Sequence, residues 1–363
     1  MKARYLLPLL FLCACQTGRH TVGSQHPAPA VIAYYHGGAE DVDKFRADQL
    51  THIIFSFLHL RGNELAVDDA GDSLTIRRLV ALKQKNTGLK VLLSLGGWGG
   101  CETCSPVFAT QQGRSDFAAS VKRLLEAFGA DGLDLDWEYP AIEGYPGHTY
   151  TLADKAHFTR LVQELRGVLG PAYEISFAAG GFKQFFDASV DWAAVMPLLD
   201  RVNVMTYDIV NGYSTQTGHH TPLYSTPQQT LSTDYGVRYL DSLGVPRSKI
   251  VIGAAFYARI WEQVPDVNHG LYQSGKFKSF VSYRNFDDTL SAKNGFVFYR
   301  DTVARAPYAY SAALQQFATF DDTHSVADKM RYVRHQKLGG LMFWQLGGDR
   351  YSGGLLQAIH DAR

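Results

Sequence analysis

Eight short apolar runs, each bounded by turn residues, constrain the fold of this 363-residue chain more than any other feature. Segments with helical periodicity fill most of the gaps between them, at 73–86, 115–128, 152–169, 226–243 and 325–336. Alternation at this spacing predicts parallel βα units, and eight such units close into a barrel with helices outside. An open, doubly wound sheet is the competing fold. The predicted strands are 31–35, 52–58, 90–95, 132–138, 174–178, 201–207, 250–256 and 340–345.

The gap between the seventh and eighth predicted strands is longer than the others. From about 261 to 320 it is rich in aromatic residues and in short strand-like runs. The predicted fold is therefore an α/β, (β/α)8 TIM barrel over 31–260 and 321–363, with an α+β insertion subdomain over 261–320. A loop that follows the C-terminal end of a barrel strand lies on the active-site face, so we expect this insertion to deepen a cleft.

The charge balance and the aromatic content indicate the kind of partner. Lys plus Arg (35) equals Asp plus Glu (35), so no long-range field attracts nucleic acid or an anionic membrane surface. The chain also has 21 Phe, 20 Tyr and 5 Trp, and those outside the core must stack against something. We expect an uncharged partner, with sugar rings as one candidate.

The first residues have the pattern of an export signal. Basic residues precede an apolar run over 6–12, which is shorter than the ~18 residues of a spanning helix. The ending Leu12-Cys13-Ala14-Cys15 resembles the lipobox of bacterial lipoproteins, in which the last cysteine is lipidated after cleavage. We expect a signal peptide over 1–14, a lipid on Cys15 and a flexible tether over 15–30, which place the protein on either face of a bacterial outer membrane. An ordinary secretory signal, giving a secreted protein, is the alternative.

Cys101 and Cys104 are the two cysteines beyond that segment. A structural zinc site needs about four ligands, and a lone C-x-x-C supplies two. Redox catalysis is disfavoured because no thioredoxin-like segment surrounds the pair. In an oxidising compartment we expect a local disulfide that staples a loop. The sequence predicts no metal and no cofactor.

The most informative segment is Asp131-Gly-Leu-Asp-Leu-Asp-Trp-Glu138 on the fourth predicted strand. Side chains alternate along a strand, so Asp134, Asp136 and Glu138 share one face while the apolar residues share the other. In a barrel the apolar face meets the helices, which leaves three carboxylates in a file inside. Such a file shares protons and spreads its pKa values apart, which suits Glu138 to general acid catalysis. A calcium site or a solvated edge strand is the structural alternative.

The order D-x-x-D-x-D-x-E on this strand resembles the signature of family 18 glycoside hydrolases, the chitinases and their relatives. The resemblance covers about 31–356 and includes the end of the expected insertion. Ala255 and Ala258 stand where the family has Pro and Gly, which affects the loop after the seventh strand. The other similar segments are Ser94-Leu-Gly-Gly97, Met205-Thr-Tyr-Asp208, 218–224, 253–262, 306–310, 317–322 and Gly340-Leu-Met-Phe-Trp344.

The resemblance implies a retaining mechanism in which the acetamido group of the substrate attacks its own anomeric carbon. Glu138 would protonate the departing oxygen and later activate water. Asp136 would accept the acetamido N–H, Tyr207 would donate to the acetamido carbonyl, and Asp134 would be the proton partner of Asp136. Asp131, which is on the opposite face of the strand or at its entry, is expected to be structural.

Further residues are expected to bind the sugar. Trp344 would form a platform beneath the ring, with ordinary packing as the alternative. Asp208 and Arg259 would hydrogen-bond the sugar, or else form a cap or an ion pair. Four other aromatic residues either line the groove or belong to the core: Tyr34, Tyr35, Trp98 and Tyr139.

The function predicted from this sequence is a monomeric chitinase that cuts β-1,4 bonds between N-acetylglucosamine units of chitin or chitooligosaccharides. An endo-β-N-acetylglucosaminidase acting on glycoprotein glycans would carry the same acids, although the expected insertion argues against it. A chitin-binding lectin without activity is a third reading, and such relatives typically lack the acid that Glu138 supplies.

Overall fold

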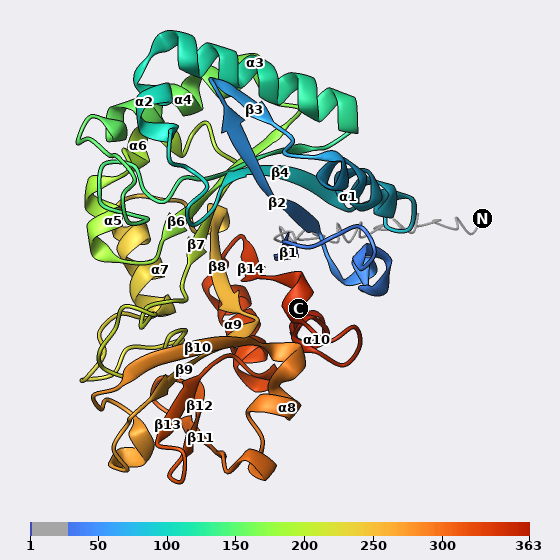
Figure 1. Ribbon diagram of the computed structural model, residues 1–363. Coiled ribbons are helices and arrows are strands. Elements are labelled where there is room, and N and C mark those ends of the chain that lie inside the picture. Colours follow the sequence, from blue (N-terminus) through green and yellow to red (C-terminus); the bar gives the residue numbers. More distant parts are fainter. Residues whose placement is uncertain (2–27) are drawn as a thin grey trace.

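The computed structural model describes Met1 and residues 28–363, and its centre is a closed parallel barrel (Figure 1). The strands pair in the order β1-β14-β8-β7-β6-β5-β4-β2, and β1 also pairs with β2, which closes the ring. This closure confirms the predicted barrel and excludes the open sheet. The barrel strands are β1 Ala30–Tyr35, β2 His52–Arg61, β4 Lys90–Gly96, β5 Gly132–Asp136, β6 Glu174–Gly180, β7 Arg201–Met205, β8 Ile250–Ala255 and β14 Gly340–Trp344.

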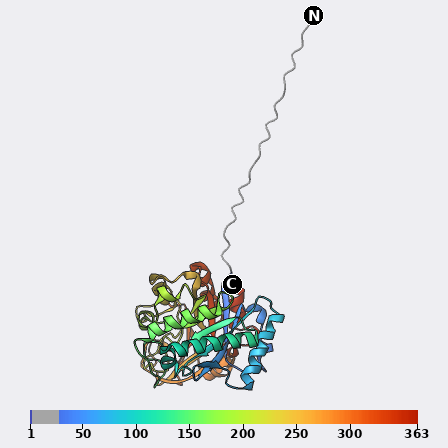
Figure 2. The ribbon, with the colours of Figure 1, turned by 90° about the horizontal axis from the view of Figure 1, so that it is seen from above.

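Helices surround the ring, and Figure 2 shows two of them, α3 and α4 (green), running next to each other across its outer side. The segment predicted as helical from 226 becomes helix α7 only at Thr233. The reason is local: Ser232 is extended and its side chain accepts a hydrogen bond from the Tyr235 N–H, which caps the helix there. The outer helices are α1 Ala70–Ala81, α2 Cys104–Ala109, α3 Gln111–Phe128, α4 Asp154–Leu169, α5 Lys183–Ala188, α6 Trp192–Val195, α7 Thr233–Ser242, α9 Thr323–Gln336 and α10 Leu355–Ala362.

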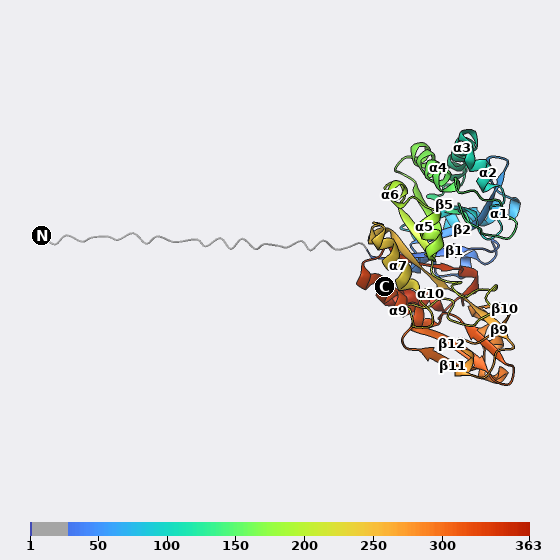
Figure 3. The same cartoon turned by 90° about the vertical axis from the view of Figure 1, so that its left-hand side faces the viewer.

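A second, antiparallel sheet lies at one end of the molecule, below the barrel in Figures 1 and 3. Its strands follow the order β10-β9-β13-β12-β11, and a short helix, α8 Phe286–Thr289, accompanies them. The sheet is inserted between β8 and β14, and its first strand begins at Tyr257, before the sequence-based boundary at 261. Its strands are β9 Tyr257–Glu262, β10 Lys276–Ser282, β11 Val297–Asp301, β12 Ala306–Ser311 and β13 Gln316–Thr319. A short hairpin strand, β3 Glu64–Ala66, extends β2.

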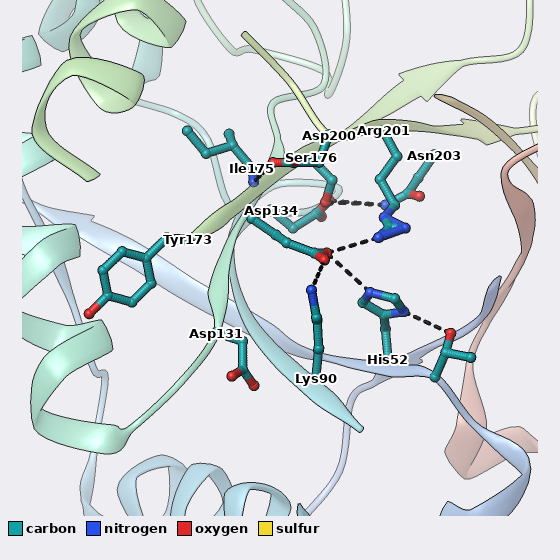
Figure 4. A network of polar contacts seen from close by, with 12 residues as sticks. His52, Lys90, Asp131, Asp134, Tyr173, Ile175, Ser176, Asp200, Arg201 and Asn203 are labelled. Atoms are coloured by element: carbon teal, nitrogen blue, oxygen red, sulfur yellow. Dashed lines mark hydrogen bonds and ion pairs between the residues drawn. The ribbon is translucent and has the colours of Figure 1, made fainter. Parts of the chain in front are cut away.

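A polar cluster fills the amino-terminal end of the barrel (Figure 4). His52, Lys90 and Arg201, at the first positions of β2, β4 and β7, all point to one carboxylate, that of Glu174 at the start of β6. The His52 Nε2 and Arg201 Nη2 atoms lie 3.1 and 3.0 Å from its Oε2. Although burial opposes it, these neighbours hold the pKa of Glu174 well below its ordinary value. The cluster closes the end of the barrel opposite the strand exits.

The amino-terminal residues 2–27 are outside the described part of the chain, so the predicted signal peptide, Cys15 and most of the predicted tether are not described. Among the described residues, no helix is long and apolar enough to cross a membrane.

Candidate active site

The three acids of the fourth strand rise through the barrel interior toward its mouth. Asp134 is 0% exposed, Asp136 is 4% exposed and Glu138 is 9% exposed. Strand β5 ends at Asp136, so Glu138 stands just past the strand rather than inside it, as the predicted range 132–138 had it. Trp137 faces the other way and packs against Phe108 of α2, with ring centroids 5.5 Å apart. The alternation predicted from the sequence therefore holds along the strand.

Asp134 accepts hydrogen bonds from four different strands. Its Oδ2 accepts from the hydroxyls of Tyr34 and Ser94, each at 3.0 Å. Its Oδ1 accepts from the Ser176 hydroxyl at 2.6 Å and from the Asn203 amide at 3.1 Å. Burial raises the pKa of Asp134, and these four donors oppose that rise. A buried carboxylate with this many donors can carry a negative charge.

Asp136 has the opposite environment. Its Oδ1 is buried and has no hydrogen-bond partner among the described residues. Burial, followed by the negative charges of Glu138 and Asp134, raises the pKa of Asp136 well above its ordinary value. The raised pKa favours the protonated form of Asp136, and its unpartnered Oδ1 is available to a ligand.

Glu138 is the acid at the mouth. Burial raises its pKa from 4.5 to about 7, the Tyr139 side chain opposes that rise, and the charge of Asp208 adds to it. An acid with a pKa near neutrality is protonated often enough to donate and ionised often enough to act as a base.

Tyr207 faces the same space from beyond β7. Its hydroxyl lies 3.9 Å from the Met342 Sδ, which is a weak acceptor, so the O–H remains available to a ligand. Burial raises the pKa of Tyr207 well above 10, with the charge of Asp136 the next cause. The hydroxyl therefore keeps its proton and can act as a donor.

These groups open into a cavity of about 1950 Å³ at the mouth of the barrel, which Asp136, Glu138 and Tyr207 line. Trp344, at the end of β14, lies on its wall with Phe57 stacked against it, at 5.4 Å between ring centroids and 14° between planes. Tyr34 approaches the same indole at 6.0 Å. The cavity thus combines a proton donor, an unpartnered buried acid and a flat aromatic surface.

Comparison with known proteins identifies the family. The model of the glycosyl hydrolases family 18 matches residues 30–349. The chain belongs to this family. Chitinase A1 of Niallia circulans is 33% identical over 300 residues, which cover 76% of this chain and 43% of that protein. Chitinase B of Serratia marcescens is 29% identical over 389 residues, which cover 86% of this chain and 76% of that protein.

A solved structure gives the same result. The family 18 N-acetylglucosaminidase from Paenibacillus barengoltzii matches with a TM-score of 0.83 and 36% identity, covering 92% of this chain and 100% of that one. This family 18 chain therefore spans the whole of one solved relative, but less than half of the length of Chitinase A1.

Asp208 and Arg259 bind each other in this family 18 barrel. The Arg259 guanidinium donates two hydrogen bonds of 2.5 Å to the Asp208 carboxylate, and the His220 Nδ1 lies 3.4 Å from Asp208 Oδ1. Although burial opposes it, these neighbours hold the pKa of Asp208 well below its ordinary value. Both members of the pair line the cavity, so the ion pair and a contact with the sugar are compatible.

The structure separates the other aromatic residues predicted for the groove. Tyr34 is 1% exposed, and its ring reaches the cavity while its hydroxyl is committed to Asp134. Trp98 is 47% exposed on the rim, with the Tyr139 ring centroid 6.3 Å away. Tyr139 also lines the cavity. Tyr35 packs in the outer core.

Several residues of this site were not predicted from the sequence. Ser176 and Asn203 bind Asp134, Phe57 stacks on Trp344, and His220 approaches Asp208. The only local signal for Ser176 and Asn203 was a polar residue within an apolar strand. In the described part of the chain, no three His, Cys, Asp or Glu side chains are grouped so as to hold a metal ion.

Proposed function

We propose that this chain is a chitinase that hydrolyses β-1,4 bonds between N-acetylglucosamine units by a retaining, substrate-assisted mechanism. The observation that carries the proposal is the pairing, inside one aromatic-walled cavity, of Glu138 with Asp136, whose Oδ1 is buried and has no partner among the described residues and whose pKa is raised. A retaining enzyme with its own nucleophile needs an ionised carboxylate beside the acid. The raised pKa of Asp136 suits a hydrogen-bonding role better than the role of an ionised nucleophile.

In the proposed first step, Glu138 protonates the glycosidic oxygen as the acetamido carbonyl oxygen attacks the anomeric carbon. Asp136 accepts the acetamido N–H through its free Oδ1, while Asp134 takes up the proton that Asp136 carries. Tyr207 donates its hydroxyl to the acetamido carbonyl and thereby aims it. These contacts strengthen as charge develops on the acetamido group, so they stabilise the transition state more than the ground state.

In the second step, the oxazolinium ion formed in this way is opened by water. Glu138, now ionised, accepts a proton from that water, and the second displacement restores the β configuration. Trp344 offers a flat face to the C–H groups of the sugar, and its stacking on Phe57 holds the indole in place. The Asp208–Arg259 pair also lines the cavity, where it can accept a hydrogen bond from a sugar hydroxyl or donate one to it.

The decisive experiment measures hydrolysis of chitooligosaccharides by the wild type and by Glu138→Gln. We expect the variant to lose at least about 10³-fold in kcat while it still binds the oligosaccharide, because binding uses the aromatic wall. Asp136→Asn should lose several kcal/mol of transition-state stabilisation, visible in kcat. Glu138→Gln activity within about tenfold of wild type would refute the assignment, and so would an α-configured first product.

A second candidate is the endo-β-N-acetylglucosaminidase reaction on glycoprotein glycans, since the same acids would serve it. The inserted antiparallel sheet favours the chitinase, because its residues Phe277 and Phe280 extend one wall of the cavity. Cleavage of a high-mannose glycopeptide without cleavage of chitohexaose would favour the second candidate. Binding of chitohexaose without any product from it or from the glycopeptide would indicate a chitin-binding lectin without activity.

We propose further that the chain is an exported lipoprotein anchored through Cys15. The support is the sequence Leu12-Cys13-Ala14-Cys15 after a short apolar run. Palmitate labelling of the protein in a bacterial host tests it: Cys15→Ala should abolish both label and membrane association, and Cys13→Ala is the matched control that should keep both. Palmitate label on the Cys15→Ala protein would contradict a lipid anchor at Cys15.

A further inference from the structure

The turn that carries Trp98 is built from residues with little conformational preference of their own. Gly96, Gly97 and Gly99 have φ values of 109°, 80° and 95°, which L side chains rarely adopt. A Cβ on Gly96 would lie 2.2 Å from the Asp136 carbonyl oxygen, and one on Gly100 would lie 2.0 Å from the Gly96 carbonyl oxygen. Glycine is therefore required at these positions, and it leaves the turn with a large entropy to lose on ordering.

Few polar contacts hold this turn. The Gly97 N–H donates to the Asp136 carbonyl and the Gly100 N–H donates to the Gly97 carbonyl, each at 2.9 Å. The Trp98 side chain is half exposed, with the Tyr145 ring edge-on to it at 5.6 Å. The Tyr139 ring, with its centroid 6.3 Å away, is the other aromatic neighbour of Trp98. These few contacts are a small restraint for an aromatic platform that must keep one orientation.

The turn ends in a disulfide. Cys101 and Cys104 are 3% and 0% exposed, are joined by the bridge, and have Cα atoms 5.1 Å apart. The Cys101 Sγ packs against Gly96, where an added Cβ would lie 3.3 Å from it. The bridge therefore contacts the last residue of β4, where the turn begins, and covalently closes the far end of the turn.

On its other side the bridge is tied to the catalytic segment. Cys104 is the first residue of α2, and the next residue, Ser105, anchors this helix to α4 by donating its hydroxyl to Asp154 at 2.9 Å. Farther along the same helix, Phe108 packs on Trp137, which stands between Asp136 and Glu138 in the sequence. The turn and the acid-bearing segment thus share one buried support.

We propose that the Cys101–Cys104 bridge is a positioning element that fixes Trp98 relative to the acids for sugar binding; this rests on the proposed chitinase function. A stabilising role for the whole fold is the competing explanation. Closing a loop between residues three apart in the sequence removes little entropy from the unfolded chain, because that effect grows with loop length. The effect of this bridge is therefore local.

The test is a double-mutant cycle on the full chain between the bridge (Cys101→Ala with Cys104→Ala) and Trp98→Ala. Steady-state hydrolysis of chitohexaose gives kcat and KM, and calorimetry in a Glu138→Gln background gives Kd without turnover. We expect removal of the bridge to raise KM and Kd roughly tenfold, with kcat within about twofold. In the Trp98→Ala background the same removal should have no further effect on KM or Kd.

Three results would overturn the proposal: unchanged KM and Kd without the bridge, effects of the bridge and of Trp98 that simply add, or a bridge-free chain that does not fold. A bridge-free chain that does not fold would show that the bridge stabilises the whole fold. The double variant Cys101→Ser with Cys104→Ser separates this loss of the bridge from the effect of the cavity that alanine leaves. A wild type that cleaves no chitooligosaccharide contradicts the proposed function instead. In that case the calorimetric cycle still tests the bridge.

Discussion

The Tyr34 hydroxyl donates a 3.0 Å hydrogen bond to the Oδ2 of Asp134 across the barrel interior, although the two residues are 100 positions apart in the chain. This bond is one of four that stabilise the negative form of Asp134. The proton that Asp136 carries moves toward Asp134 in the proposed reaction, so the strength of these four bonds helps to set the proton balance of the whole file.

Tyr34→Phe removes one donor and keeps the ring. A hydrogen bond to a charged group contributes about 1.5–3 kcal/mol, so loss of this donor favours a resting enzyme in which Asp134 is already protonated. Asp134 then cannot take up the proton that Asp136 carries, and we expect kcat to fall at least about tenfold with little change in KM. Tyr35→Phe is the matched control, because Tyr35 is the next residue of the same strand, but its hydroxyl faces the outer core and donates to the Gly38 carbonyl. Equal kcat values for the two variants would contradict the role given to Tyr34.

The pH profile should follow Glu138. A general acid works in its protonated form, so kcat/KM should fall as the pH rises through about 7. Asp208→Asn removes a negative charge that raises this pKa, so the alkaline limb should move to lower pH. Rates measured from pH 4 to 10 with a chromogenic chitobioside give both limbs. An unmoved or raised alkaline limb would exclude this electrostatic coupling.

Glu138 should also reduce stability. Its folded pKa, about 7, is above its ordinary value of 4.5, so between these values the folded state binds more protons than the unfolded state. Stability is then lost as the pH rises from 4.5 to 7, by roughly 3 kcal/mol in total. Glu138→Gln should raise Tm at pH 8 and leave it nearly unchanged at pH 4. A Tm difference independent of pH would count against the raised pKa.

The cluster at the other end of the barrel should act on stability alone. Glu174→Gln leaves three cationic or basic neighbours without their carboxylate, and we expect a loss of about 3 kcal/mol in the free energy of unfolding at pH 7. Because the pKa of Glu174 is lowered in the fold, its contribution is present above its unfolded pKa and is lost as the pH falls below it.

Denaturant unfolding measures this loss, and Glu64→Gln is the control. Glu64 pairs with Arg123 on the surface, with side chains 53% and 60% exposed, so its replacement should cost less than about 1 kcal/mol. Both variants should keep the wild-type kcat at temperatures where they are folded. A Glu174→Gln chain as stable as Glu64→Gln would show that the cluster contributes little.

Local patterns were sufficient for the architecture. Period-2 and period-3.6 apolar spacing is a property of neighbouring residues, and eight alternating units have few closed arrangements, so the barrel and the inward face of Asp134 and Asp136 followed directly. The ends of elements were less accessible. Strand β5 stops at Asp136, and α7 begins at Thr233 because Ser232 caps it.

The register between distant strands could not be predicted from any local pattern. The four donors to Asp134 come from β1, β4, β6 and β7, and they meet it only because pairing such as Ser94 with Asp134, and Asp134 with Ser176, puts them in one layer. The same holds for Phe57 on Trp344 and for Arg259 on Asp208. The acids can be identified from the sequence of one strand, whereas their protonation depends on burial and on charges that only the fold brings together from distant parts of the chain.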